Sequence, residues 1–268
     1  MRLTGAMGTF IAALVVPGSG YWIVGRRRSG LATAVAVAGI VMVFAWTRLL
    51  LDPAGYYALL LAESVFLLAT ALHAATLAFR SAGEKRNWRF AIASSVACYA
   101  ALYVFFSVRD TTLGYETFVV PASSMAPTIL RGDYILVDTW AYRHADPEAG
   151  DVVVFTQPQT GIKYVKRVIG TPSDTVALVS NVLVRNGERI DEPYTLDDDN
   201  AVRIFDLPEQ TVPPDDYLVL GDNRNNSRDS RFFGAIPRGN IVGKVRHVFF
   251  ASGDDARFPE RRIPMRFD

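Results

Sequence analysis

Cysteine and histidine are scarce in this chain of 268 residues, and their scarcity excludes several kinds of site. Cys98 is the one cysteine, so the chain can form neither an internal disulfide nor a cluster of thiolate metal ligands. The three histidines, His73, His144 and His247, are scattered without metal-ligand spacing. We therefore expect each histidine to be structural, and we expect no metal or other cofactor.

A strong excess of positive charge is also absent, because the formal net charge is +1 at pH 7. A nucleic-acid-binding domain presents a basic face, so this total argues against a nucleic-acid partner. Residues 1–107 carry nine Lys or Arg and three Asp or Glu (+6), whereas residues 108–268 carry nineteen and twenty-four (−5), consistent with the total. We predict two domains, 1–107 apolar with basic connectors and 108–268 water-soluble.

Long apolar runs in the first domain predict a multi-span α-helical membrane region. Three runs, 31–51, 56–79 and 88–107, each reach the ~20 residues that a membrane-spanning helix needs. Aromatic residues at both ends of 88–107 are typical of anchoring at the membrane interfaces. Glu63 lies inside the second run, where an acid is a functional candidate; we favour a protonated or paired carboxyl in a helix bundle.

An earlier apolar run, residues 9–24, is interrupted by Pro17-Gly18-Ser19-Gly20. The part before this break is too short to cross a hydrocarbon core ~30 Å thick. We interpret the run as an interfacial or re-entrant segment, with a kinked fourth span as the alternative. No small-residue cleavage site follows it, so we expect no removable signal peptide.

The basic connectors predict the orientation of the spans. Arg26, Arg27 and Arg28 precede the first span, and four basic residues lie between the second and third, whereas the turn at 52–55 has none. Because positively charged loops stay in the cytoplasm, the third span should leave residues 108–268 on the extracytoplasmic side.

Short strands dominate the second domain, and no amphipathic helical pattern occurs, so we predict a predominantly β fold. Asn186-Gly187 between apolar segments predicts a β-hairpin, and residues 197–200 predict a solvated loop. The basic tail, 257–267, is interpreted as solvated, with contact to anionic lipid as the alternative. The predicted strands are 115–120, 134–137, 151–155, 162–169, 175–179, 217–220 and 242–250.

Three stretches of this domain indicate chemistry. Ser124 lies in a loop, 121–133, whose backbone Pro121 and Pro127 restrict. Lys166 lies inside a run of β-branched residues, where a buried amine is costly unless it is used. Residues 221–231 place many hydrogen-bonding side chains in one turn.

The serine, the lysine and the polar turn, in this order, resemble the bacterial type I signal peptidases, the Ser-Lys proteases that remove secretory signal peptides. The resemblance covers 118–250, with Arg131-Gly132-Asp133 and 150–155 as further matching segments. It implies a multi-pass protein of the bacterial cytoplasmic membrane that cleaves preproteins after a small-x-small motif. It also implies a compact β fold with a hairpin-bearing insertion at about 175–216.

Amide hydrolysis needs a nucleophile and a base that can be neutral, and no histidine lies near Ser124 in any of these motifs. Burial would lower the pKa of Lys166 from ~10.4 toward the working pH. By resemblance, Ser124 is the nucleophile and Lys166 the general base. Arg167 falls on the opposite strand face by the two-residue period, and we expect it to be a surface ion.

The resemblance also implies roles within the polar turn. Ser227 matches a serine that hydrogen-bonds and orients the lysine. Asp229 and Arg231 match a charged pair that we expect to be scaffolding. We expect Asp222 and Asn223 to fix the turn itself.

For the oxyanion, the backbone amide of Ser124 is one expected donor. Many relatives carry a serine two positions before the nucleophile, but this chain has Ala122, which offers no hydroxyl. A second donor would then be Ser123, another backbone amide or water. The family binds its substrate as an added strand, and 117–121 and 161–165 are the expected walls of its pockets.

Other functions fit parts of the pattern. A self-cleaving repressor would need an N-terminal DNA-binding domain, where this chain has apolar spans. A specialised maturation peptidase for one exported protein stays open. A catalytically inactive membrane protein that binds signal peptides is the alternative from another class, and the intact Ser124 and Lys166 argue against it.

Overall fold

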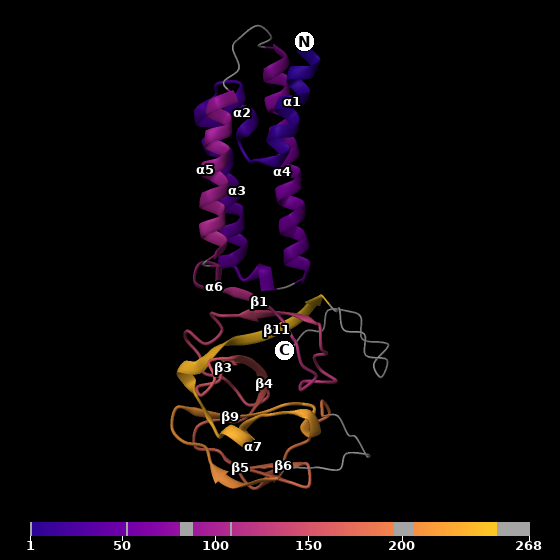
Figure 1. Ribbon diagram of the computed structural model, residues 1–268, viewed down its shortest axis with the longest axis vertical. Helices are drawn as coiled ribbons and strands as arrows, with labels where there is room; N and C mark the ends of the chain where they lie inside the picture. The colour runs from indigo at the N-terminus through magenta and orange to yellow at the C-terminus, as the bar shows by residue number, and fades with distance from the viewer. Residues whose placement is uncertain (1, 52, 81–87, 108, 196–205, 251–268) are drawn as a thin grey trace. The chain divides into compact units, whose positions relative to one another are not determined.

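The computed structural model describes residues 2–51, 53–80, 88–107, 109–195 and 206–250 (Figure 1). Contacts divide the chain into two units, Met1–Leu113 and Gly114–Asp268, and each is described by itself. The first unit is helical and the second consists mainly of strands.

The helical unit contains three long helices and several short ones (Figure 1). Helix α1 packs along α4, while α2 packs against α3 and α5. The described part of this unit also contains the 3-10 turn η1 at Leu49–Leu51 and the short helix α6 at Arg109–Thr112. The remaining helices are α1 (Arg2–Val15), α2 (Ser19–Ile23), α3 (Arg27–Trp46), α4 (Pro53–Arg80) and α5 (Trp88–Ser107).

The break expected near Pro17 separates α1 from α2. Gly18 has φ 84°, a left-handed conformation that glycine adopts without strain. A Cβ atom at Gly18 would lie 2.1 Å from the carbonyl oxygen of Gly30, so this turn packs directly against the start of α3. Close packing of two backbones therefore explains the glycines here.

The long helices differ slightly from the predicted spans. Helix α3 begins four residues before the expected Leu31 and ends at Trp46 instead of residue 51, because the chain turns at Arg48 (φ 64°) into η1. The turn expected at 52–55 is wrong, since Pro53 begins α4, where its missing amide is tolerated. Helix α5 has the predicted bounds, and Glu63 is half-buried on α4.

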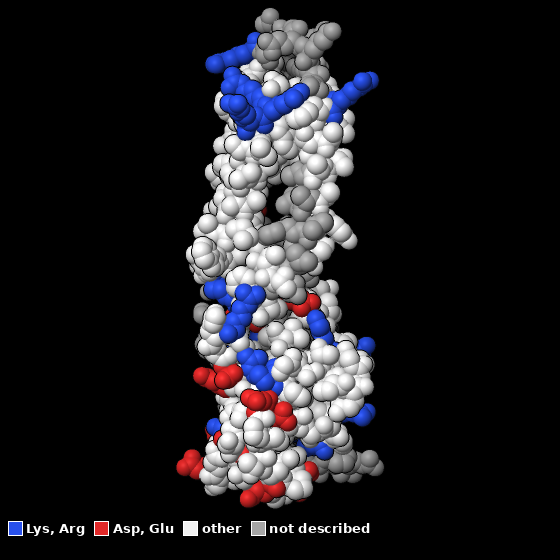
Figure 2. All heavy atoms as spheres, turned by 90° about the vertical axis from the view of Figure 1, so that its left-hand side faces the viewer, with Lys and Arg blue, Asp and Glu red and all other residues white. Residues whose placement is uncertain are grey.

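Two described helices, Arg27–Trp46 and Tyr57–Arg80 within α4, are long and apolar enough to cross a membrane by length and composition, with mean hydropathy 2.0 and 1.8. Figure 2 shows that Lys and Arg gather at one end of the helical unit and are absent from the adjoining surface in this view. Arg26, Arg27 and Arg28 are exposed where α2 meets α3.

The second unit contains a seven-stranded antiparallel sheet with the order β1-β2-β11-β3-β4-β9-β10 (Figure 1). Apolar side chains alternate between its faces along β3: Val152 and Val154 join one buried cluster, whereas Val153 and Phe155 join another. The strands are β1 (Tyr115–Val119), β2 (Tyr134–Asp138), β3 (Val152–Thr156), β4 (Lys163–Gly170), β9 (Asp216–Leu220), β10 (Ile236–Pro237) and β11 (Ile241–Phe250).

A four-stranded antiparallel sheet, ordered β7-β6-β5-β8, lies in sequence between β4 and β9. Asn186 and Gly187 both have positive φ (55° and 82°), as a tight hairpin turn requires, and they join β6 to β7. The solvated loop predicted at 197–200 and the basic tail lie outside the described residues. These strands are β5 (Thr175–Val179), β6 (Val182–Arg185), β7 (Glu188–Arg189) and β8 (Leu207–Thr211).

Three features of this unit were not predicted. Strand β8 has a mixed polar sequence, and β10 has two residues, so neither shows a strand pattern. The short helix α7 (Ser230–Phe233) begins within the polar turn, and the Asp229 side chain caps it by accepting a hydrogen bond from the amide of Arg231.

Candidate active site

Ser124 lies in the long loop that joins β1 to β2. Main-chain hydrogen bonds close the ends of this loop, from the amide of Val120 to the carbonyl of Asp133 (2.9 Å) and from that of Gly132 to Val120 (2.7 Å). Packing also anchors the loop, because its residues Met125 and Ile129 are fully buried in the core of the unit. Packing and hydrogen bonding therefore both hold the backbone that carries Ser124.

Lys166 extends from β4 to the serine. Its Nζ atom donates to Ser124 Oγ at 2.6 Å and to the carbonyl of Val165 at 2.9 Å. Only 2% of the residue is exposed. The structure thus brings together the two residues that the sequence predicts to react, although 42 positions separate them.

Burial lowers the pKa of Lys166 from 10.5 to about 8, because the ammonium form loses its hydration. The carboxylates of Asp229 and Asp222 raise this pKa, and the guanidinium of Arg231 lowers it. A pKa near 8 leaves part of the amine neutral at physiological pH. In the neutral form, Nζ can accept the Ser124 proton across the same short contact.

Asn223 also holds the loop that carries Ser124. Its backbone amide donates to the carbonyl of Ser124 (3.2 Å), and its side-chain Nδ2 donates to the carbonyl of Ser123 (3.1 Å). The neighbouring Gly221 permits this approach, because a Cβ atom there would lie 2.4 Å from the Ser124 carbonyl oxygen. Asn223 therefore does more than fix its own turn.

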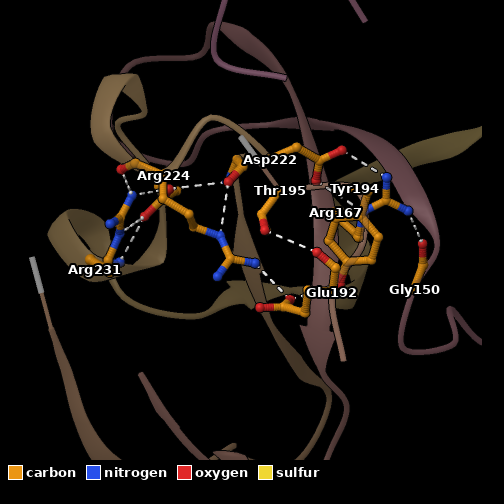
Figure 3. A network of polar contacts seen from close by, with 10 residues as sticks. Gly150, Arg167, Glu192, Tyr194, Thr195, Asp222, Arg224 and Arg231 are labelled. Atoms are coloured by element: carbon orange, nitrogen blue, oxygen red, sulfur yellow. Dashed lines mark hydrogen bonds and ion pairs between the residues drawn. The ribbon is translucent and has the colours of Figure 1, made fainter. Parts of the chain in front are cut away.

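Arg167 is buried and paired, so the expectation of a surface ion is wrong. Its Nε and one terminal nitrogen donate to the two carboxylate oxygens of Asp222, at 2.9 and 2.7 Å, and its other terminal nitrogen donates to the carbonyl of Gly150 (Figure 3). The side chains of Arg167 and Asp222 are 10% and 0% exposed. Arg167 does lie on the other face of β4 from Lys166, but residues of the insertion pack on that face, with the Tyr194 ring against Arg167 and Leu178 against Ile169.

Asp229 and Arg231 form a second buried pair. Arg231 donates to both carboxylate oxygens of Asp229 at 2.8 Å. It also donates to the carbonyl of Arg224 at 2.7 Å, as Figure 3 shows. Asp229 in turn accepts a hydrogen bond from the amide of Gly221. The pair therefore links the two ends of the polar turn.

Ser227 does not make the contact that the resemblance implies. In the part of the chain that the structure describes, the Ser227 hydroxyl is buried and has no hydrogen-bond partner. Its backbone is extended after a 3-10 turn, η2 (Arg224–Asn226), and a Cβ atom at Gly221 would lie 2.2 Å from its Oγ. The hydroxyl is thus placed over the backbone of Gly221, and the expected bond to Lys166 is not formed.

Three polar residues near this site were missed from the sequence. Arg224 is 1% exposed, and it donates to Glu192 at 2.6 Å and to the carbonyl of Gly221 at 3.1 Å. The ring of Tyr194 lies 3.8 Å from the guanidinium carbon of Arg167. No pattern in the segment around Glu192 distinguishes it from a surface loop, so only the contacts reveal it.

A serine hydroxyl that receives a hydrogen bond from a buried lysine amine, on a rigid antiparallel β scaffold, is the arrangement of a Ser-Lys hydrolase. The family model described as "Signal peptidase, peptidase S26" matches residues 89–250, from α5 to β11. The chain belongs to this family.

Curated relatives and a solved structure carry related names. The chain is 38% identical over 145 residues to a probable signal peptidase I-2 of Synechocystis, covering 50% of this chain and 64% of that protein. It is 36% identical over 170 residues to a signal peptidase I of Bacillus caldolyticus, covering 60% and 87%. A crystal structure of a signal peptidase I from Enterococcus faecalis matches at 33% identity, covering 37% of this chain and 96% of that chain, with TM-score 0.33.

Proposed function

We propose that this protein is a membrane-bound serine endopeptidase, a signal peptidase I, that removes N-terminal signal peptides from exported preproteins. The contact of 2.6 Å between Lys166 Nζ and Ser124 Oγ carries the proposal, since it joins a nucleophile to a buried amine of lowered pKa. Membership of the signal peptidase family supports the substrate class.

The reaction follows from these two groups. Neutral Lys166 accepts the hydroxyl proton as Ser124 Oγ bonds to the scissile carbonyl carbon, and the resulting oxyanion is met by the Ser124 amide and a second donor. When the C–N bond breaks, Lys166 returns the proton to the leaving amine, and an acyl-serine ester remains. A water molecule then attacks the ester while Lys166 accepts one of its protons, and Lys166 passes this proton to the departing Ser124 oxygen.

Substrate binding by strand addition fits the sheet. Strand β1 is at one end of the order of the seven-stranded sheet, and it leads directly into the loop that carries Ser124. Val119 at the end of β1 and Ile162 before β4 are 52% and 58% exposed, so each can contact an apolar residue of a bound peptide. We place the pocket walls in 117–121 and 161–165, with small pockets that select small side chains.

Membrane attachment is assigned to the first unit. Helices α3, α4 and α5 would cross the bilayer, and the α1–α2 segment would be interfacial or re-entrant. Large exposed apolar side chains on α3 and α4 fit lipid contact, among them Val35, Trp46 and Leu61 at 62%, 82% and 66% exposure. The exposed arginines at 26–28 would stay cytoplasmic, and the β unit would then lie on the extracytoplasmic side of a bacterial cytoplasmic membrane.

Purified full-length protein in detergent, incubated with a tagged precursor, tests the proposal. We expect one cut after a small-x-small motif, identified by mass spectrometry of both fragments, and no cut by Ser124→Ala. A precursor with a bulky residue directly before the cut should resist. Cleavage of one precursor among many would favour a specialised maturation peptidase, and binding without cleavage would favour an inactive signal-peptide receptor.

A further inference from the structure

The segment that follows β7 in the four-stranded insertion contacts Arg167 of β4 and Arg224 of the polar turn (Figure 3). It forms a turn in which the amide and the hydroxyl of Thr195 both donate to the carbonyl of Glu192, at 3.1 and 2.9 Å. Glu192 and Tyr194 project from this turn, and the Tyr194 hydroxyl donates to Glu192 Oε1 at 2.7 Å. The turn therefore presents a carboxylate and an aromatic ring as one unit.

The ring of Tyr194 covers the guanidinium of Arg167, whose carbon lies 3.8 Å from the ring centroid. This distance is well within the range of a cation–π contact, which is strongest where water is excluded. All three nitrogens of the guanidinium are already oriented by Asp222 and by the Gly150 carbonyl. Tyr194 therefore shields the Arg167–Asp222 pair from water and restricts the guanidinium to one plane.

The carboxylate of Glu192 pairs with Arg224 at 2.6 Å, and the two side chains are 6% and 1% exposed. One terminal nitrogen of Arg224, Nη1, is buried without a hydrogen-bond partner among the described residues. Glu192 thus neutralises a buried cation whose hydrogen bonding is already incomplete. Loss of this carboxylate would leave the positive charge uncompensated.

Both contacts end one residue from a group of the active site. Arg167 follows Lys166 on β4, and Arg224 follows Asn223, whose amide holds the Ser124 carbonyl. We propose that Glu192 and Tyr194 are positioning residues for the Ser124–Lys166 pair, which act through Arg224 and Arg167. The insertion would then keep β4, which carries Lys166, and the polar turn, which holds the Ser124 loop, in fixed positions relative to each other. This role is separate from any contact with substrate.

This inference rests on the proposed function, and its physical consequence is electrostatic. The groups that face Lys166 are the Ser124 hydroxyl, the Tyr164 ring at 5.6 Å, Asp222, Asp229 and Arg231. Asp222 raises the pKa of the amine, and Arg167 neutralises Asp222. If Arg167 is held less tightly, Asp222 should act more strongly on Lys166 and keep it protonated to higher pH.

The test uses the full-length protein in detergent with a quenched fluorescent peptide that contains one small-x-small site. We expect Tyr194→Leu to shift the midpoint of the rise of kcat with pH upward by about half a unit. Below the midpoint this shift lowers kcat about threefold, with KM unchanged. Tyr194→Phe keeps the ring and should retain the wild-type midpoint.

A matched control and a double variant separate positioning from general destabilisation. Leu183→Ala opens the core of the same insertion, where Leu183 is 2% exposed, without removing a polar contact; it should lower the melting temperature and leave the midpoint in place. Because Tyr194 is argued to act through Arg167, Tyr194→Leu should add no further shift in an Arg167→Lys background.

An unchanged midpoint in Tyr194→Leu, or a full additional shift in the double variant, would overturn the inference while the wild-type protein still cleaves the peptide. An inactive wild type, or an active Lys166→Ala variant, would instead refute the proposed function. Glu192→Gln supplies a second measurement. It should lower kcat with KM unchanged, and an unaltered kcat would remove Glu192 from the positioning role.

Discussion

Arg167 and Asp222 form a two-bond ion pair, at 2.9 and 2.7 Å, that joins the strand carrying Lys166 to the turn that holds the Ser124 loop. Asp222 places a carboxylate near Lys166, and Arg167 neutralises that carboxylate. Burial can therefore lower the pKa of the amine even though two carboxylates lie nearby. The predictions below follow from this balance and from the geometry of the site.

The first prediction concerns the pH dependence of catalysis. Lys166 must be neutral to accept the Ser124 proton, and its pKa is about 8. We expect kcat to rise with pH, about tenfold per unit well below pH 8, and to level off above it. Single-turnover rates across pH 6–10 would check this. A rate that falls between pH 7 and 9 would contradict a lysine base.

The second prediction concerns stability. The pKa of Lys166 is lowered from 10.5 to about 8 in the folded protein, so between these values the unfolded chain binds more protons and stability rises with pH. Lys166→Met removes this penalty, which is about 3 kcal/mol at most. It should raise the melting temperature below pH 8, and the gain should shrink toward pH 10.5.

Lys163→Met is the matched control for this measurement, because its amine is on the same strand but its side chain is 42% exposed. Its exposed pair with Glu116 should contribute less than ~1 kcal/mol. A gain of equal size in both variants, or one that does not depend on pH, would disagree with the assigned pKa.

A third prediction separates the charges of the pair Asp229–Arg231, which is 0% and 1% exposed. Arg231→Met leaves a buried carboxylate uncompensated and should lower stability by roughly 3–5 kcal/mol. It should also move the midpoint of the pH–rate curve upward, because Asp229 raises and Arg231 lowers the pKa of Lys166. Thermal melts and pH–rate curves measure the two effects.

The double variant Asp229→Asn, Arg231→Met should recover part of the stability and return the midpoint toward that of the wild type. Asp146→Asn is a control for loss of an exposed pair, since its side chain is 80% exposed, and it should change stability by less than ~1 kcal/mol. An Arg231→Met variant as stable as this control would show that the pair is not buried in solution.

The fourth prediction concerns the oxyanion. Ala122 is exposed two positions before Ser124 and offers no hydroxyl donor. One oxyanion donor contributes roughly 2.7–4 kcal/mol to lowering the barrier. We expect Ala122→Ser to raise kcat with little change in KM, measured by steady-state kinetics on one small-x-small peptide. An unchanged or lowered kcat in a folded variant would show that another donor already fills this position.

The fifth prediction concerns topology. A reporter that is active only outside the cytoplasm should be active when fused after Asp110 and silent when fused after Gly83. The reason is the positive charge at the start of α3, at the end of α4 and in the connector between α4 and α5, which should remain in the cytoplasm. Alkaline phosphatase activity in intact cells measures both fusions, with immunoblots as the control for expression. The reverse pattern would refute an extracytoplasmic β unit.

Most of the β elements could be predicted from the sequence, because alternation and turn chemistry are local. Strand β5 has the predicted bounds, and Asn186-Gly187 forms the predicted turn. Strand β8 could not be predicted, since its sequence Leu-Pro-Glu-Gln-Thr has no strand pattern and pairing with β5 supplies its order. The predicted end of α3 was also wrong, because apolar composition continues to Leu51 although the helix stops at Trp46.

The sequence by itself predicted the predominantly β class of the second unit, and through a family resemblance it predicted Ser124 as nucleophile and Lys166 as base, because these residues and the polar turn lie in patterns of neighbouring residues. Only the tertiary structure decided what surrounds them. Arg167 is buried against Asp222, 55 residues away, and Glu192 pairs with Arg224, 32 residues away. The Ser227 hydroxyl lies over Gly221 and not against Lys166, because its turn packs on that glycine. The energy of an ion pair or a buried hydroxyl is set by its surroundings in space, and period and composition carry no information about those surroundings.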